Sequence, residues 1–158
     1  MTDLTSASSL LDLWRKLQHL PGGTRLFSYL LARRVPYSGS IRARIEELTP
    51  GYARARITDR KCLRNHLESI HAIALTNLGE LTSGLAMTAA MPRGLRGIPT
   101  ELHIEFLKKA RGPIVAEGRS PIPDPDRDGK YEAEALMKDS TGESVAILRA
   151  QWVVSHRP

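Results

Sequence analysis

The sequence predicts an α+β fold in which a curved antiparallel sheet wraps around one long helix. Apolar residues recur at helical spacing over a single long stretch, from Ile70 to about Met91. Runs that alternate with period two lie before this stretch and again after it, separated by turn-rich segments. One long helix and one sheet must bury their apolar faces against each other, so we expect a two-layer architecture.

Two short amphipathic helices precede this body. The first has leucines and Trp14 at helical spacing and ends at 21–23, a Pro-Gly-Gly turn. The second carries Phe27 among leucines on one side and ends between Pro36 and Gly39. We expect residues 1–38 to form a helical extension that covers an edge or end of the sheet, and residues 39–158 to form the main unit of a single structural domain. A membrane-surface role for the two helices is the alternative.

The remaining elements follow from the change of period. Residues 41–57 alternate around a Thr-Pro-Gly turn and predict a hairpin, and the polar stretch 59–67 predicts a loop. Ser69 is the expected cap of the long helix, whose many small residues allow other elements to approach closely. Residues 92–99 are rich in Pro and Gly and are expected to form a loop. Four further strands are expected at 100–108, 114–122, 130–139 and 143–155.

Composition restricts the classes of function. The 158 residues carry a net charge of +6, which suits an anionic partner, but the charge is scattered and aromatic content is only 5%. We therefore expect no nucleic-acid binding. The apolar runs are too polar to form an integral membrane segment. Asp3, Asp12 and Arg15 fall where a secretory signal needs an apolar core, and the lone Cys62 cannot form an internal disulfide, so we expect a cytoplasmic protein.

The stretch 65–80 carries the candidate chemistry. Glu80 falls near the buried side of the long helix, where a carboxylate is costly unless it is paired, hydrogen-bonded or used. The helix is expected to begin near His71 and Ala72, where backbone N–H groups have no acceptor within the helix. These N–H groups and the helix dipole favour negative charge there. The row of Glu101, His103 and Glu105 is interpreted as a solvent-facing strand face, and we expect no metal site.

The order of elements, together with these residues, resembles the hotdog fold, and within it the acyl-CoA thioesterases of the phenylacetate-pathway type. In that family an Asn precedes the helix, a His-Gly pair opens it, and an acid follows about two turns later. The matching residues are Asn65, His71 with Ala72 in the glycine place, and Glu80. The two leading helices resemble an addition in an uncharacterised branch of the superfamily, described as a domain of unknown function.

The resemblance implies a role for each matching residue. Glu80 would be general base or nucleophile, and Asn65 would orient the water or the carboxylate. His71 would polarise the substrate, the N–H of Ala72 would hold the thioester oxygen, and Thr100 is the nearest match to an assisting Ser or Thr. The alternatives are a Glu80 paired with an Arg or at a subunit contact, an Asn65 that bonds its own loop, and a simple helix-end His71. The methyl group of Ala72 departs from the family's glycine and puts activity in question.

The substrate and assembly follow from the same resemblance. Nine residues separate His71 from Glu80, about 13 Å along a helix, so one monomer does not bring them together. The family's solution is a two-fold homodimer, or a dimer of dimers, in which the acid meets the partner's loop. The implied substrate is acyl-CoA with no other cofactor. Its phosphates would meet a basic group around the third strand, namely Arg93, Arg96, Lys108, Lys109 and Arg111.

Two other functions remain open. A hotdog dehydratase uses a loop His and a helix acid, and His66 and Glu80 are compatibly spaced, but the proline-rich segment that follows that His is missing. A non-catalytic acyl-CoA or fatty-acyl binding module would keep the affinity for the thioester without turnover. Ala72 favours this second alternative.

Overall fold

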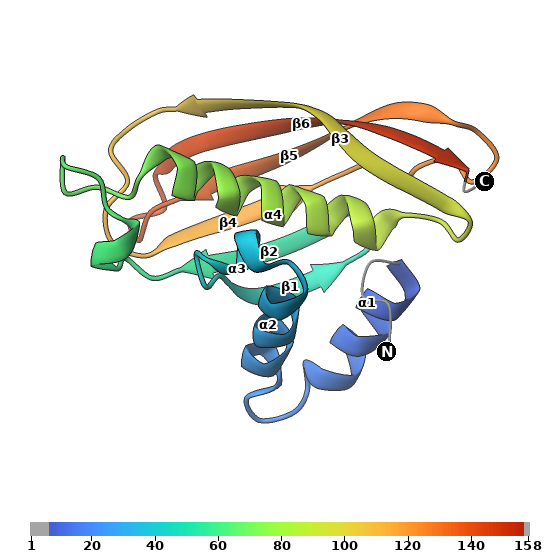
Figure 1. Ribbon diagram of the computed structural model, residues 1–158, viewed down its shortest axis with the longest axis horizontal. Coiled ribbons are helices and arrows are strands. Elements are labelled where there is room, and N and C mark those ends of the chain that lie inside the picture. Colours follow the sequence, from blue (N-terminus) through green and yellow to red (C-terminus); the bar gives the residue numbers. More distant parts are fainter. Residues whose placement is uncertain (1–6, 157–158) are drawn as a thin grey trace.

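A six-stranded antiparallel sheet curves around one long helix, α4 (Ala72–Ala90), which confirms the expected α+β class (Figure 1). The computed structural model describes residues 7–156. Asp3 and the outer limits of the expected units 1–38 and 39–158 lie outside the described residues. The other elements are α1 (Ala7–Leu17), α2 (Gly23–Arg34), α3 (Pro36–Gly39), β1 (Arg44–Thr49), β2 (Tyr52–Ile57), a 3-10 turn η1 (Lys61–Leu63), β3 (Leu95–Phe106), β4 (Ile114–Arg119), β5 (Gly129–Lys138) and β6 (Ser144–His156).

The strands are ordered β1-β2-β4-β5-β6-β3, and every neighbouring pair is antiparallel. Hairpins join β1 to β2, β4 to β5 and β5 to β6, as the alternating runs predict. β3 is different, because it pairs with the last strand and not with β4, so the chain crosses the sheet between β3 and β4. This crossing places β1 and β3 at opposite edges of the sheet.

The expected loop 92–99 is wrong in its second half, because β3 begins at Leu95. Pro99 lies inside this strand, opposite Trp152, and the register shifts between Pro99 and Glu101. Proline is tolerated on an edge strand and beside a bulge, since its missing N–H leaves no ladder bond unmade there. The helix cap also differs from expectation. His71, not Ser69, is the N-cap of α4.

Small residues let α4 lie close to the sheet. A Cβ added at Gly118 of β4 would lie 2.4 Å from the carbonyl oxygen of Thr82, so backbone meets backbone at this point. A Cβ at Gly79 of α4 would lie 2.9 Å from the Cβ of Leu148 in β6. Buried alanines continue this close contact across the sheet, at Ala53, Ala55, Ala116, Ala133, Ala135 and Ala150.

The N-terminal helices share the core of the sheet. Trp14 of α1 and Phe27 of α2 are buried and meet edge to face, with ring centroids 5.0 Å apart. The Ser28 hydroxyl accepts the Ile45 N–H at 2.9 Å, which ties α2 to the edge strand β1. Figure 1 shows α1 and α2 gathered on the β1 side of the molecule, below α4. The extension therefore forms one wall of the spaces around the central helix.

Candidate functional site

Glu80 lies in the middle of α4 with its side chain half-buried. It lines a cavity of about 200 Å³ whose walls come from α1, α2, α4 and β6, among them Leu10, Leu31, Leu85 and Trp152. Burial raises the pKa of the Glu80 carboxyl group above its ordinary value. Within residues 7–156 the carboxylate has no hydrogen-bond or ion-pair partner. The cavity therefore contains a carboxylate that no described residue binds.

Space beside the carboxylate depends on Gly84, one helical turn further on. A Cβ there would lie 3.7 Å from Glu80 Oε1 and 3.6 Å from Cζ2 of Trp152. The indole N–H of Trp152 is buried and has no acceptor among the described residues. A buried donor without a partner is costly and marks a place where a bound group is expected. The cavity thus combines a carboxylate with a largely apolar wall.

The first turn of α4 leaves one N–H available. His71 Nδ1 accepts from the Ile73 N–H at 3.1 Å, and the His71 carbonyl accepts from Ala74 at 2.9 Å and from Leu75 at 3.1 Å. The Ala72 N–H has no acceptor in the described part of the chain. It is the group expected to hold a thioester oxygen, and the helix dipole favours negative charge there.

Asn65 closes its own loop. Its Oδ1 accepts from the Leu67 N–H at 2.9 Å, the Ser69 N–H at 3.3 Å and the Ser69 hydroxyl at 3.2 Å. Its backbone N–H donates to the Ser69 carbonyl at 2.8 Å. The side-chain oxygen therefore has the structural role that the alternative interpretation describes. The Nδ2 amide has no described partner, so a role in orienting a ligand remains a prediction for that group.

A single chain does not bring the predicted site residues together. His71 lines a separate cavity of about 220 Å³, and that cavity shares no wall residue with the Glu80 cavity. Thr100 lies in β3, where its hydroxyl donates to the Gln151 carbonyl at 3.3 Å. It follows Pro99, the strand neighbour of Trp152, but it does not line the Glu80 cavity.

The basic residues predicted for the phosphates lie at both ends of β3. Arg93 and Arg96 are at its start, while Lys108, Lys109 and Arg111 follow its end. A strand of 12 residues extends about 40 Å, so one chain does not present the five as one group. Lys108 is also paired with Asp139, at 2.7 Å, and with Glu143.

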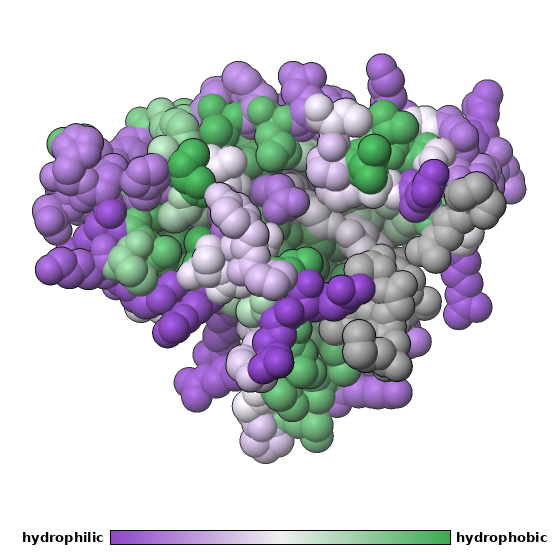
Figure 2. All heavy atoms as spheres, in the orientation of Figure 1, coloured by the Kyte–Doolittle hydropathy of each residue, from purple (hydrophilic) through white to green (hydrophobic). Residues whose placement is uncertain are grey.

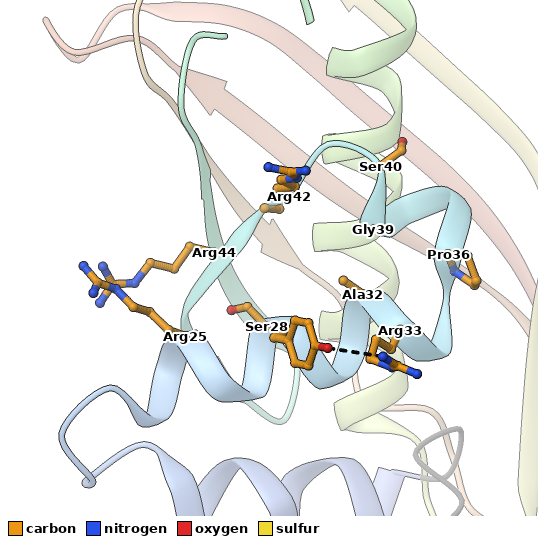
Figure 3. Close-up of a pocket in the computed structure, with 11 residues that line it drawn as sticks. Arg25, Ser28, Ala32, Arg33, Pro36, Gly39, Ser40, Arg42 and Arg44 are labelled. Carbon is orange, nitrogen blue, oxygen red and sulfur yellow. Dashed lines mark hydrogen bonds between the residues drawn. The ribbon is translucent and has the colours of Figure 1, made fainter. Parts of the chain in front are cut away.

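A larger hollow was missed by the sequence analysis. It has a volume of about 650 Å³, lies between α2, α3 and the start of β1, and is lined by Arg25, Arg33, Arg42 and Arg44 (Figure 3). A usable signal exists in the sequence, because no Asp or Glu occurs between Asp12 and Glu46. The stretch therefore carries uncompensated positive charge that a count over the whole chain hides.

The described residues contain neither a candidate membrane span nor a candidate metal site. Among residues 7–156 no helix is both long and apolar enough to cross a bilayer. In the same residues no three His, Cys, Asp or Glu side chains are grouped so that they could hold a metal ion.

Comparison with known proteins gives a family and a fold. The family model described as "Domain of unknown function (DUF4442)" matches residues 23–154. A structural-genomics crystal structure is 28% identical, with a TM-score of 0.81, and the match covers 92% of this chain and 97% of that one. A Pseudomonas aeruginosa protein described as a probable thioesterase is 27% identical, with a TM-score of 0.72 and coverage of 87% and 97%. A thioesterase family protein from Silicibacter pomeroyi is 21% identical, with a TM-score of 0.69 and coverage of 82% and 96%. No curated protein matches. The expected hotdog fold is confirmed.

Proposed function

The chain belongs to the DUF4442 family, and from this membership and its hotdog fold we propose that it hydrolyses the thioester of an acyl-CoA. The observation that carries the proposal is the half-buried carboxylate of Glu80, which has no partner in residues 7–156 and faces a largely apolar cavity. An acid so placed costs stability, and catalysis gives a reason to keep it. The described name of the Pseudomonas relative supports the same reaction class.

The chemistry needs a base and an oxyanion donor. Burial raises the pKa of Glu80, which makes its carboxylate a better proton acceptor near neutral pH. As general base it takes a proton from water while the water oxygen bonds to the thioester carbon. The C–S bond then breaks, and the departing sulfur takes the proton to leave as coenzyme A thiol. As nucleophile the carboxylate would itself bond to that carbon while the C–S bond breaks, and water would then hydrolyse the resulting anhydride, which releases the acid, restores Glu80 and supplies the proton for the coenzyme A thiol. The free N–H of Ala72 would stabilise the developing oxyanion.

The proposed active unit is a homodimer, or a dimer of dimers, formed at β3. One edge of β3 has no strand partner among the described residues. Leu102, Ile104 and Phe106 share the inner face of the sheet, and Leu102 and Phe106 are 45% and 49% exposed. Figure 2 shows apolar surface along the margin where β3 runs in Figure 1. A second copy paired there would cover this face and bring its Asn65 and His71 region toward Glu80.

A non-catalytic acyl-CoA binding module is the second candidate, and Ala72 is the observation that favours it. Its methyl group narrows the place where the family has glycine. Such a protein would retain the thioester but not turn it over.

The test measures release of coenzyme A from a panel of acyl-CoAs in the presence of a thiol reagent. We expect release by the wild type and its loss in Glu80→Gln. Asp126→Asn is the matched control, because Asp126 is exposed in the β4–β5 loop and changes in the same way. Saturable binding with no release at any acyl length would contradict hydrolysis and support the binding module.

A further inference from the structure

The hollow between α2, α3 and β1 is here named the arginine cavity, after Arg25, Arg33, Arg42 and Arg44, which line it. In Figure 3 the guanidinium groups of Arg25 and Arg44 gather at one end, Arg33 lies at the other, and Arg42 lies above. Its volume of about 650 Å³ falls within the range of small-molecule sites. Among the residues that the structure describes, no acidic side chain lines it.

These arginines are not neutralised by the described part of the chain. Arg25 and Arg42 have no carboxylate partner there, and Arg44 Nη2 donates to the Thr24 hydroxyl at 3.1 Å. Arg33 Nη1 donates to the Tyr29 hydroxyl at 3.2 Å. On the adjacent strand the pattern is the opposite. Arg54 and Arg56 both pair with Glu46, at 3.3 Å and 2.9 Å. Four like charges around one space favour an anionic occupant.

The backbone at Arg42 supports a binding role. Its φ is +50°, a left-handed conformation that non-glycine residues rarely adopt. The fold imposes this conformation between buried Ile41 and the tight contact at Gly39, where a Cβ would lie 2.6 Å from the Ala32 carbonyl oxygen. The Arg42 N–H donates to the Gly39 carbonyl at 3.0 Å. The Arg42 side chain is thereby held at the wall of the cavity at the expense of local strain.

We propose that the arginine cavity binds the phosphate groups of a soluble nucleotide. Guanidinium groups match phosphate oxygens with paired, charge-assisted hydrogen bonds. Tyr29, which lines the same cavity and is 57% exposed, offers an aromatic face to a base. A concave site suits a small molecule better than the flat array of headgroups on a lipid surface. The choice of coenzyme A as the nucleotide rests on the proposed function, whereas phosphate binding does not.

The site is separate from the candidate catalytic cavity. The arginine cavity and the Glu80 cavity share no wall residue, and the segment from Ala32 to Gly39 lies between them. A hollow of about 10 Å³, bounded by Ala32, Gly39, Leu31 and Leu81, touches the walls of both. Nucleotide binding and hydrolysis can therefore be measured independently.

The test is isothermal titration of the full chain with coenzyme A, dephospho-coenzyme A and inorganic pyrophosphate. We expect all three to bind, with coenzyme A tightest because it carries one more phosphate than its dephospho form. The double variant Arg42→Gln/Arg44→Gln should weaken coenzyme A binding by about tenfold or more, from the loss of charge-assisted bonds. The variant Arg42→Gln/Arg44→Lys should recover part of this loss, since lysine keeps the positive charge at position 44. Arg127→Gln, an exposed arginine of the β4–β5 loop, is the control and should bind as the wild type does.

Three results would overturn the proposal. One is no binding of any probe to the wild type, and another is equal coenzyme A affinity in the wild type and a folded double variant, checked by thermal unfolding. The third is binding only to vesicles that contain phosphatidylglycerol, which would identify a lipid surface instead. Titration of Glu80→Gln separates the two proposals. Arginine-dependent binding without hydrolysis by the wild type would refute only the proposed function. Hydrolysis by the wild type, without arginine-dependent binding of any of the three probes, would refute only this inference.

Discussion

A side chain at Gly84 would reach the Glu80 carboxylate, because its Cβ would lie 3.7 Å from Glu80 Oε1. The two residues are one helical turn apart and share a face of α4. The hydrogen atom of glycine therefore leaves room beside the carboxylate.

Gly84→Ala should increase the stability of the protein and decrease its rate of acyl-CoA hydrolysis. The new methyl group would make only ordinary contacts, and alanine is about 1 kcal/mol better than glycine inside a helix. We expect a higher free energy of unfolding in urea, together with weaker acyl-CoA hydrolysis because the cavity is narrower. Gly79→Ala is the matched variant. Its Cβ would lie 2.9 Å from Leu148 Cβ and 3.0 Å from Met137 Cε, so it should destabilise. Equal effects of the two variants would contradict this account.

Glu80→Gln should show a stability effect that depends on pH. The folded state raises the pKa of Glu80 above its ordinary value of 4.5, so the folded protein binds this proton more tightly than the unfolded chain does. The free energy of unfolding therefore falls as pH rises from the ordinary pKa through the raised one. The substitution should stabilise at pH 8, do less at pH 4, and reduce hydrolysis by about a hundredfold or more. Asp126→Asn should give no such difference between the two pH values in urea titrations.

Two substitutions of Asn65 should separate its role in the loop from a role in catalysis. Asn65→Asp keeps the oxygen that accepts from Leu67 and Ser69, and so should retain most of the stability, while Asn65→Ala should lose about 1–2 kcal/mol. If the Nδ2 amide orients a ligand, Asn65→Asp should also lose hydrolysis. Thermal unfolding and coenzyme A release, measured on the same samples, decide the matter. Full activity in Asn65→Asp would restrict Asn65 to its loop.

The edge strand β3 should control assembly. Leu102→Asp combined with Phe106→Asp puts charges on the exposed apolar face, so we expect a dimeric wild type and a monomeric, inactive variant. Ile122→Asp is the control, because Ile122 is 66% exposed and belongs to the loop after β4 and not to β3. Sedimentation equilibrium gives the mass of each. A wild-type monomer that hydrolyses acyl-CoA would refute the shared site.

Periodicity within a short stretch of sequence predicts most helices and strands. The errors occur where an element depends on its pairing with a distant part of the chain. The period of 3.6 over α4 and the alternation in the last strands are sufficient to predict these elements, because each pattern reflects the burial of one face of the helix or strand. The Pro and Gly content of 92–99 predicts a loop, whereas Leu95–Pro99 belongs to β3, and Pro99 is tolerated there because β3 is an edge strand. Pro36 predicts the end of a helix, and in the structure it is also the first residue of α3.

The candidate site was predictable in part for a similar reason. The position of Glu80 on the helix followed from spacing along one element, but its cavity is made with α1, α2 and β6, which no local pattern relates. The arginine cavity joins residues of α2 to residues before and within β1, and only the distribution of charge along the chain indicates it.

The contact between Gly118 and the Thr82 carbonyl has a consequence for how this protein can diversify. Thr82 is two residues from Glu80, so the height of the acid above the sheet is set by main chain against main chain. Exchanging core side chains leaves that height unchanged. Relatives that accept longer or shorter ligands would then differ in the outer walls, α1 and α2, and not in the layer that carries the acid.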